Sequence, residues 1–590
     1  FQSKSLNKVF TMKDQVVIHN TATKQWMRFD KPEEVFIAHR TEEVIPCLNK
    51  LEEMVWKHGM YAAGFLSYEA APAFDEALCV KPMDSFPLVW FGMYSRPEVF
   101  HLPVHDGVSA YTLGEWIPSV SISDYEQTIA QIKELIARGD TYQVNYTYRL
   151  NTTFTGDSWS FFLKLIQAQQ TGYAAYIDMG RYIICSASPE LFFCLDGDTL
   201  VSRPMKGTVA RGRTLAEDKI QSEWLYNSEK NRAENIMIVD MIRNDMGRIA
   251  NIGSVEVTSF YDIERYPTLF QMTSTVASTT SNSVAEIITA LFPCASITGA
   301  PKPRTMQIIS ELETTPRRIY TGSIGYIAPD RKAQFNVAIR TVLIDKKTEQ
   351  AEYGFGGGIV WDSESADEYN ECQVKARILA SDRPEFSLLE TILWTSDNGY
   401  FLLDYHFRRL LDSAEYFDYN ADIERIEKKL KSEAASFSDG SYKVRLLVSK
   451  EGTIICQSIP LKDFEQPGTV RLRLSHEPVD SGNLFLYHKT TNRRIYDAAK
   501  TACPDCDDVL LFNERDEITE SCIANIIVKI NGELLTPPVE CGLLPGTFRA
   551  WLLDRGEVKE KILTIDALKK AEEIYVINSV RKWQHAVILW

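Results

Sequence analysis

The sequence predicts an α+β protein of two domains. Its 590 residues exceed what one hydrophobic core usually supports. Short apolar runs separated by turn residues occupy 8–118 and 317–360, and helical patterns lie between these ranges. Near Asp382-Arg383-Pro384 a helical pattern ends at a proline, and a new pattern of strand and helix begins. We therefore place the domain boundary between 383 and 384.

The first domain, 4–383, is expected to contain an N-terminal part, 4–118, and a catalytic core, 122–380. In the core, SDYE at 123–126 can cap a helix that runs to about Arg138.

A longer helix with an apolar stripe is expected near 216–247, and strands should dominate from 317 to 360. The second domain, 384–590, should open with a strand (LLETILW) followed by a helix (DYHFRRLLDSAEYF).

Composition and charge exclude several functional classes. A net charge of −16 and a pI near 5.2 argue against nucleic acid as a partner, because phosphate binding needs clustered Lys and Arg. No stretch approaches 18 uninterrupted apolar residues, and the first residues have no signal-peptide pattern. Phe1-Gln2-Ser3 resembles the scar of a cleaved tag, which leaves the native start open. We expect a cytoplasmic protein that does not bind membranes.

The placement of histidine limits the chemistry of the first domain. Nine histidines are present, and none lies between His105 and His406. Any catalysis in this interval must therefore use carboxylates, lysine, arginine or backbone groups. The eleven cysteines are an odd number in a long chain, so they do not predict a disulfide framework.

Two motifs in the histidine-free interval carry candidate catalytic residues. In SPELFF, Glu190 is a carboxylate in an apolar stretch, where burial would raise its pKa and suit a general acid. In RPMKGT, Lys206 lies near Arg203, Arg211 and Arg213, and neighbouring cations would favour the neutral, nucleophilic amine. The alternatives are a glutamate that faces water and a solvated loop lysine.

Further carboxylates in the same interval fit a hard metal ion. Glu234 lies on the long helix expected near 216–247, and Glu368 and Glu371 are three residues apart, on one face of a second helix. Carboxylates without His or Cys suit Mg²⁺, which binds few protein ligands and keeps its waters. Ser365 and Glu368 also fit a capping box, so Glu371 is the stronger candidate ligand of that pair.

Two glycine-containing segments could present backbone N–H groups to an anion. One is SITGAPK at 296–302, which precedes a helix, and the other is GFGGG at 354–358. Tight turns are the alternative explanation of each segment.

Together these motifs resemble the chorismate-utilising enzymes. The resemblance is strong over 122–380 and includes TYQVNYT, SPELFF, RPMKGT, EKNRAENIMIVDMIRND, TGAPKPRTM, YTGSIGY, AIRT, GFGGG and EYNECQVKA. It implies a large two-sheet domain with surface helices. The lysine of the KGT motif resembles that of the members that form aminodeoxychorismate, since anthranilate synthases typically carry alanine there.

The resemblance also implies roles for individual residues. Lys206 would attack the chorismate ring at C2 while Glu190 protonates the departing C4 hydroxyl, and ammonia would then add at C4 and expel the lysine. Glu234 and Glu371 resemble the Mg²⁺ ligands, with Glu368 in support. Tyr320 and Arg340 resemble the pair that holds the enolpyruvyl carboxylate. The remaining implied substrate-binding residues are Thr298, Gly299, Gly356, Gly357 and Lys375.

One position departs from this pattern. Gln271 stands where many members have histidine, so a proton-transfer role of that histidine cannot operate here.

The second domain has its own ordered motifs. Lys489 follows an apolar segment in YHKTTNR, Glu520 lies in EITES before a strand, and GLLPGTFR at 542–549 opens a helix. These motifs, with Arg409, resemble the fold-type IV pyridoxal-phosphate enzymes, whose domain has two α/β subdomains. The resemblance implies that Lys489 forms the imine with the cofactor and that Glu520 faces the pyridine nitrogen. Arg409, Gly546 and Thr547 would hold the cofactor phosphate.

The two resemblances together imply the conversion of chorismate to p-aminobenzoate for folate synthesis, by amination and then by pyridoxal-phosphate-dependent loss of pyruvate. The ammonia would come free or from a separate glutamine amidotransferase subunit, since the sequence has no glutaminase-like nucleophile motif. The oligomeric state stays open, with a homodimer through the C-terminal domain as one candidate, and so does channelling between the sites.

Two alternatives remain at this point. The first is an anthranilate- or isochorismate-type synthase fused to a branched-chain or D-amino-acid aminotransferase. The second is a non-catalytic, ligand-binding scaffold.

Overall fold

The computed structural model describes residues 14–102, 110–366, 368–369, 385–461 and 468–590. The chain divides into two compact units. One comprises 1–210 and 222–383, and the other comprises 211–221 and 384–590. The short segment 211–221 therefore belongs with the C-terminal unit, although it lies in the first half of the sequence.

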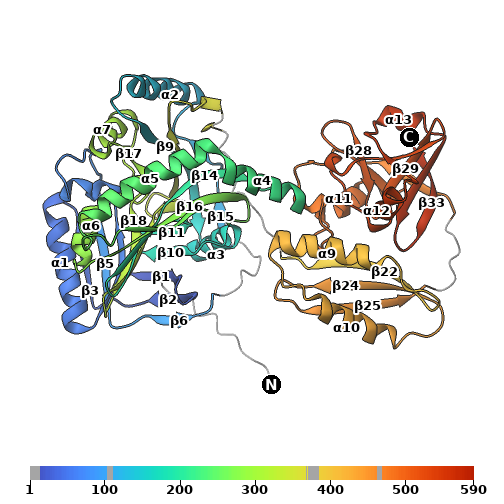
Figure 1. The fold of residues 1–590 in the computed structure, drawn as a ribbon, viewed down its shortest axis with the longest axis horizontal. Coiled ribbons are helices and arrows are strands. Elements are labelled where there is room, and N and C mark those ends of the chain that lie inside the picture. The colour runs from blue at the N-terminus through green and yellow to red at the C-terminus, as the bar shows by residue number, and fades with distance from the viewer. Residues whose placement is uncertain (1–13, 103–109, 367, 370–384, 462–467) are drawn as a thin grey trace. The chain divides into compact units, whose positions relative to one another are not determined.

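Two large antiparallel sheets form the first unit (Figure 1). The 11-stranded sheet has the order β17 (Gly299–Ala300), β9 (Gln143–Gly156), β21 (Gln350–Ile359), β20 (Thr341–Asp345), β11 (Tyr182–Ser188), β10 (Tyr173–Asp178), β1 (Gln15–Asn20), β2 (Gln25–Phe29) and β6 (Glu98–Phe100), with β7 (Tyr111–Leu113) and β8 (Ile117–Pro118) on β9. The 10-stranded sheet has the order β14 (Met205–Ala210), β16 (Leu269–Thr279), β13 (Thr199–Arg203), β12 (Leu191–Asp196), β19 (Lys332–Val337), β18 (Ser323–Ala328), β4 (Tyr61–Leu66), β5 (Val89–Tyr94) and β3 (Glu34–Ala38), with β15 (Glu256–Arg265) on β16.

Helices cover the outer faces of both sheets. Against the 10-stranded sheet lie α1 (Thr41–His58), α5 (Glu229–Gly247) and α6 (Val284–Leu291), and against the 11-stranded sheet lie α2 (Ile122–Ala137), α3 (Ser158–Gln169) and α7 (Lys302–Leu312). Short 3₁₀ helices occur at η1 (Tyr68–Ala73) and η2 (Ala295–Ile297). The layers are thus helix, sheet, sheet and helix, which confirms the predicted two-sheet α+β architecture.

Strand β1 shows why these strands are apolar on both faces. Val16 and Ile18 pack between the two sheets with Phe65 of β4 and Ile184 of β11. Val17 points the other way, into the core under the outer helices. Alternate residues of a strand face opposite sides of its sheet, so a central strand buried on both sides needs a continuous apolar run.

Two helix boundaries differ from the sequence prediction. Helix α2 is capped by Ser121, whose hydroxyl accepts a hydrogen bond from the Asp124 N–H, and not by Ser123. The single helix expected near 216–247 is two helices, α4 (Leu215–Asn227) and α5, because Ser228 interrupts it and caps α5. A serine side chain competes for backbone N–H groups, so it ends one helix as readily as it starts the next.

The second unit has two sheets. The antiparallel sheet β23 (Gly399–Tyr400), β22 (Leu388–Thr395), β24 (Ser441–Val448) and β25 (Ile454–Pro460) packs on α9 (Leu403–Phe417) and α10 (Ile423–Ala434). The mixed sheet has the order β28 (Ile518–Ser521), β27 (Asp508–Phe512), β26 (Val470–Leu474), β33 (Lys582–Leu589), β32 (Glu573–Asn578), β29 (Asn525–Ile530), β30 (Glu533–Thr536) and β31 (Lys559–Glu560). It packs with α11 (Arg494–Ala502), α12 (Thr547–Asp554) and α13 (Ile565–Lys569), and η4 (Leu484–Leu486) and η5 (Val539–Cys541) are 3₁₀ helices. The two predicted α/β subdomains are thereby confirmed.

No helix within the described ranges has both the length and the apolar character needed to span a membrane.

A buried ion pair joins distant segments of the first unit. The guanidinium of Arg317 lies 2.7 Å from the carboxylate of Glu313, and the two side chains are 1% and 4% exposed. Arg317 also donates to the carbonyls of Asn145 on β9 and Ile297 on η2, at 2.7 and 2.9 Å. Glu313 accepts from the backbone N–H and the hydroxyl of Thr147. The pair therefore fixes a strand, a 3₁₀ helix and a loop relative to one another.

We predict that Arg317→Met lowers the free energy of unfolding of the first unit by about 3–5 kcal/mol, because it removes the cation from a buried carboxylate and one donor from each of two buried carbonyls. Urea unfolding followed by intrinsic fluorescence measures this change. Lys57→Met is the matched control, since its partner Glu53 is largely solvent-exposed, and it should leave the transition unchanged. Equal small effects of the two substitutions would contradict the role assigned to the buried pair.

Candidate functional sites

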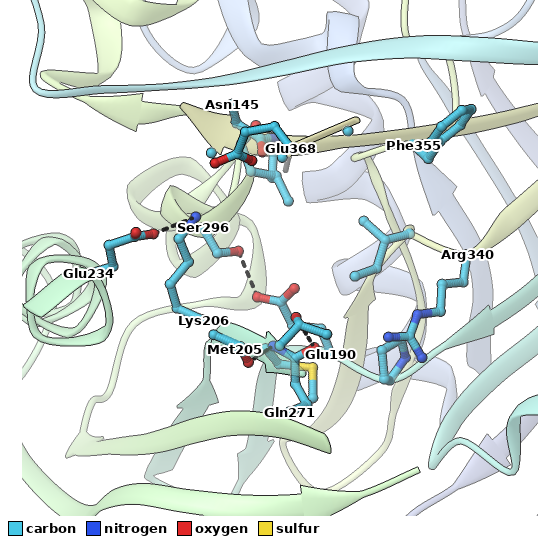
Figure 2. Close-up of a pocket in the computed structure, with 18 of the residues that line it drawn as sticks. Asn145, Glu190, Met205, Lys206, Glu234, Gln271, Ser296, Arg340, Phe355 and Glu368 are labelled. Atoms are coloured by element: carbon cyan, nitrogen blue, oxygen red, sulfur yellow. Dashed lines mark hydrogen bonds and ion pairs between the residues drawn. The ribbon is translucent and has the colours of Figure 1, made fainter. Parts of the chain in front are cut away.

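The first candidate site is a cavity of about 150 Å³ in the first unit. It lies where β14, α5, η2 and β21 meet, and its lining includes Glu190, Lys206, Glu234, Tyr320 and Arg340. Figure 2 shows Glu234 on one side and Arg340 on the other, with Glu190 and Lys206 between them. The structure therefore brings together residues from Asn145 to Glu368, which are far apart in the sequence.

Glu190 is a buried carboxyl in the short connection between β11 and β12, and it is 3% exposed. Its Oε1 accepts a hydrogen bond of 2.6 Å from the hydroxyl of Ser296. Burial raises the pKa of Glu190 to about 7, against the opposing effects of Ser296, the Met205 N–H and Lys206. At neutral pH this carboxyl can therefore both give and take a proton.

Lys206 projects from β14 into the same cavity. Its Nζ lies 3.5 Å from the carboxylate of Glu234, and both side chains are largely buried. Gly358 provides the space for the amine, because a Cβ at that position would come within 2.2 Å of Nζ. The amine thus faces the cavity opposite a strand that has no side chain there.

The three arginines near Lys206 in the sequence each pair with a carboxylate. Arg203 pairs with Glu264, Arg211 with Asp218, and Arg213 with Glu217. Each positive charge is therefore matched by its own carboxylate, and Lys206 itself is paired with Glu234.

Gln271 fastens the strand that carries Lys206. Its Nε2 donates to the carbonyl of Gly207 at 2.8 Å, and its Oε1 accepts from the hydroxyl of Thr208 at 3.0 Å. The pairing of β14 with β16 shifts register between Met205 and Thr208, so regular ladder bonds are lost around Lys206. The glutamine side chain replaces them and holds the irregular segment in place.

Most of the predicted substrate-binding residues lie around this cavity. Tyr320, Arg340, Gly356 and Gly357 line it. Arg340 is buried, and one of its nitrogens donates to Gln169.

Thr298 and Gly299 are not among the residues that line the cavity. Thr298 is fully buried and Gly299 pairs with Val144 of β9, whereas the neighbouring Ser296 and Ile297 line the cavity instead. Lys375 lies outside the described residues.

Two of the three predicted metal ligands lie at the cavity. Glu234 and Glu368 line it, and the carboxylate of Glu368 accepts from the Ser363 hydroxyl at 2.6 Å. Gly357 allows Glu368 to approach, since a Cβ there would come within 3.0 Å of Oε2. Glu371 lies outside the described residues, and no three potential ligands of His, Cys, Asp or Glu type converge within them. Two buried carboxylates without His or Cys fit the oxygen chemistry of Mg²⁺.

The second candidate site is a cavity of about 730 Å³ in the second unit. Lys489, Glu520, Arg409, Gly546 and Thr547, which are the five residues predicted to hold the cofactor, all line it. Burial, together with the charge of Arg409, lowers the pKa of Lys489 to about 8. A substantial fraction of this amine is therefore neutral, and able to condense with an aldehyde, near physiological pH.

Glu520 is held in this cavity by buried hydrogen-bond donors. Glu520 accepts from the Tyr496 hydroxyl at 2.8 Å, the Leu544 N–H at 3.0 Å and the Asn525 amide at 3.2 Å. Burial raises the pKa of Glu520 to about 7. The carboxyl is thus oriented by three donors and can share a proton with a nearby base.

Arg409 is anchored by a carboxylate that the sequence did not single out. Its Nε and Nη2 donate to Glu390 at 2.9 and 2.6 Å, and Nη1 donates to the Pro545 carbonyl. A guanidinium has five N–H groups, so two remain for a further anion. Burial pushes the pKa of Glu390 upward, but Arg409 and His406 outweigh it and lower the pKa to about 2. Glu390 is therefore a permanent anion that orients Arg409 beside Gly546 and Thr547.

In comparisons with known proteins, two different family models match the two halves of the chain. Residues 13–381 match the family model of chorismate binding enzymes, and residues 387–587 match that of class IV amino-transferases. Aminodeoxychorismate synthase component 1 of Escherichia coli (strain K12) is 39% identical over 259 residues, which are 44% of this chain and 57% of that protein. Anthranilate synthase component 1 3 of Haloarcula marismortui is 38% identical over 259 residues, 44% of this chain and 51% of that protein.

Among solved structures, anthranilate synthase component I from Streptococcus pneumoniae aligns with a TM-score of 0.53 and 24% identity, over 64% of this chain and 95% of that one. This likeness supports the fold of the first unit. The chain spans about half the length of the two curated relatives.

We predict that the lowered pKa of Lys489 appears in its acylation by an amine-directed reagent. The neutral amine reacts, so a lysine of pKa about 8 should react about tenfold faster at pH 9 than at pH 7 and level off above pH 9, whereas an ordinary lysine should gain about a hundredfold. Peptide mass spectrometry of the cofactor-free protein gives this ratio residue by residue. Lys529 is the internal control, because its bond to Glu573 raises its pKa. Equal ratios at Lys489 and Lys529 would contradict the assignment.

Proposed function

The chain belongs to the chorismate binding enzyme family, and we propose that it makes p-aminobenzoate in two steps. The first unit would convert chorismate and ammonia to 4-amino-4-deoxychorismate, and the second would remove pyruvate from that product. One observation carries the proposal: the amine of Lys206 and the carboxyl of Glu190, whose pKa is about 7, line the same cavity. Overall identity does not separate aminodeoxychorismate from anthranilate chemistry, since both kinds of relative are 38–39% identical.

The geometry supports an exchange at the ring in which each bond made is matched by one broken. The Lys206 nitrogen bonds to C2 while Glu190 gives its proton to the C4 oxygen, which leaves as water. Ammonia then bonds to C4, the bond between C2 and the lysine nitrogen breaks, and the new C4 ammonium returns a proton to the Glu190 carboxylate. Ser296 holds the Glu190 carboxyl toward the cavity.

Charged groups around the cavity would orient a substrate with two carboxylates. Arg340 and Tyr320 would hold the enolpyruvyl carboxylate, because a guanidinium fork matches that group. Glu234 and Glu368, with Glu371 outside the described residues, would hold a Mg²⁺ ion that screens the ring carboxylate from an acidic protein. We further propose that a separate glutamine amidotransferase subunit supplies the ammonia.

The second unit would use pyridoxal phosphate. The cofactor supplies an electron sink for bond cleavage next to the bound nitrogen. Lys489 would carry it and then move protons, Glu520 would face its ring nitrogen, and Arg409 with Gly546 and Thr547 would hold its phosphate. The family model that matches residues 387–587 is that of the class IV amino-transferases, so this match alone does not favour a lyase. The covalent link to a domain that makes an aminated chorismate favours the lyase, because the first product is the second substrate.

We predict that the two lysine variants divide the reaction into its halves. With chorismate, ammonia, Mg²⁺ and pyridoxal phosphate, Lys206→Ala should form neither product, whereas Lys489→Ala should accumulate 4-amino-4-deoxychorismate. An equal mixture of the two variants should restore p-aminobenzoate. Chromatography with mass detection distinguishes the species. Amination by Lys206→Ala at the wild-type rate would refute the role of this lysine, and formation of anthranilate would favour the alternative synthase.

We predict that amination follows the protonation of Glu190. The acid works only in its protonated form, and wild type and Glu190→Gln need the same Lys206 amine. With the concentration of free NH₃ held constant, the ratio of the wild-type kcat/KM to that of Glu190→Gln should therefore fall about tenfold per pH unit above pH 7. At pH 7 Glu190→Gln should lose about 10²–10⁴ of the rate. Thr258→Val, at an exposed position of β15, is the control and should keep the wild-type pH profile. A ratio that does not change with pH would assign the acid role to another group.

A further inference from the structure

Residues 211–221 lie far from the second unit in the sequence but form part of it. Arg211 and Asp218 form a buried ion pair at 2.5 Å, and Asp218 also accepts from the Gly212 N–H at 2.9 Å. The segment is thereby closed on itself. A segment whose buried charged groups are paired within it has the properties of a fixed structural element and not of a flexible linker.

This element is bound to helix α9. Arg211 donates to the carbonyl of Tyr416 at 2.9 Å, and its guanidinium lies 4.3 Å from the centre of the Tyr416 ring. The Tyr416 hydroxyl donates in return to the Gly212 carbonyl at 2.7 Å, in a buried position. Because both partners of each bond are shielded from water, undocking would expose several polar groups at once.

The same element reaches the residues that precede Lys489. Arg213 donates to the Tyr487 hydroxyl at 2.9 Å, and its guanidinium lies over the Tyr487 ring. The ring of His488, which is 4% exposed, places Nε2 at 3.1 Å from the Arg213 carbonyl and Nδ1 at 3.0 Å from the Ser413 hydroxyl. A carbonyl can only accept, so Nε2 carries the proton and the Ser413 hydroxyl donates to Nδ1.

His488 keeps this arrangement over the physiological range. Burial lowers its pKa to about 4, so the ring stays neutral with its proton on Nε2. The ring also packs against Tyr416 and Phe417 at centroid distances of 4.5 and 4.7 Å. On the other side, the Lys489 carbonyl accepts from the Leu389 N–H of β22 at 2.9 Å. The backbone of Lys489 is therefore held from two directions, and one of them depends on segment 211–221.

We propose that segment 211–221 is a functional part of the second unit. The Arg213 carbonyl holds His488, and His488 is a positioning residue for Lys489. The chain that follows the strand of the first catalytic lysine thus helps to place the second one. This inference rests on the proposed role of Lys489. Its tests need neither chorismate nor turnover, so it stands or fails separately from the proposed reaction.

The first test changes His488 and reads the placement of Lys489 in the full-length, cofactor-free protein. His488→Phe removes both hydrogen bonds and keeps a ring, whereas His488→Gln keeps a donor for the Arg213 carbonyl. The measured quantity is the ratio of Lys489 acylation at pH 9 and pH 7. We expect His488→Phe to raise the ratio from about 10 toward about 100, as the amine leaves its buried position. His488→Gln should stay near the wild-type ratio.

The charged groups around Lys489 are Arg409, Glu390, Arg493 and Glu520. They are unchanged in all variants, so a shifted ratio reports the position of the amine. Binding of pyridoxal phosphate, followed by its absorbance, should weaken about tenfold in His488→Phe, the loss expected for one buried hydrogen bond.

The second test loosens the segment itself. Arg211→Met combined with Asp218→Asn replaces the buried ion pair by neutral groups of similar size and removes the donor to Tyr416. We expect faster tryptic cleavage after Arg213 together with a raised acylation ratio at Lys489. Arg555→Met is the control, because Arg555 forms an exposed pair with Glu557 in the same unit, and it should change neither quantity.

An unchanged acylation ratio in His488→Phe would overturn the proposal. Faster cleavage in the double variant with Lys489 unaffected would also overturn it, and would reduce segment 211–221 to a docked linker.

Discussion

The pairing of Arg317 with Glu313 is the interaction on which the first cavity depends most. It holds β9, η2 and the loop before Tyr320 through hydrogen bonds to buried polar groups, and the loss of such a bond costs free energy. Ser296 lies next to Ile297, whose carbonyl Arg317 binds, and Ser296 in turn holds Glu190. An ion pair that does not line the cavity therefore supports the segment that holds Glu190 in it.

The two cavities arrange a lysine and a glutamate in opposite ways. In the first, Lys206 is paired with Glu234, and the buried carboxyl of Glu190 accepts a hydrogen bond from the Ser296 hydroxyl. In the second, the cation Arg409 near Lys489 reinforces burial and favours the neutral amine. Since the protein as a whole carries a charge of −16, these local arrangements and not the overall charge determine what each site attracts.

The sequence predicts the layers of the fold well because hydrophobic periodicity reports burial directly. The apolar run at 16–18 and the alternating strands of 317–360 became central strands. Helix ends were less predictable, as Ser121 and Ser228 show, because any nearby serine can cap. Of the candidate lysines and glutamates, Glu190, Lys206, Glu234 and Glu368 line the first cavity and Lys489 and Glu520 line the second, whereas Glu371 and Lys375 lie outside the described residues.

Local sequence patterns do not show which side chains hold those residues in place. Ser296 and Glu190 are 106 positions apart, and Glu390 on β22 pairs with Arg409 on α9. Gln271 was visible only as a missing histidine, and its bonds to Gly207 and Thr208 depend on a shifted register that no periodicity reveals. Supporting contacts of this kind arise from tertiary packing, so local patterns do not encode them.

The carboxylate of Glu234 has two candidate partners. It already lies 3.5 Å from the amine of Lys206, so a metal ion bound there would share the carboxylate with that amine. Binding of the ion and the contact between Glu234 and Lys206 are therefore thermodynamically linked, and each changes the free energy of the other by the same amount. A single carboxylate thus couples the placement of an amine to the cations of the surrounding solution.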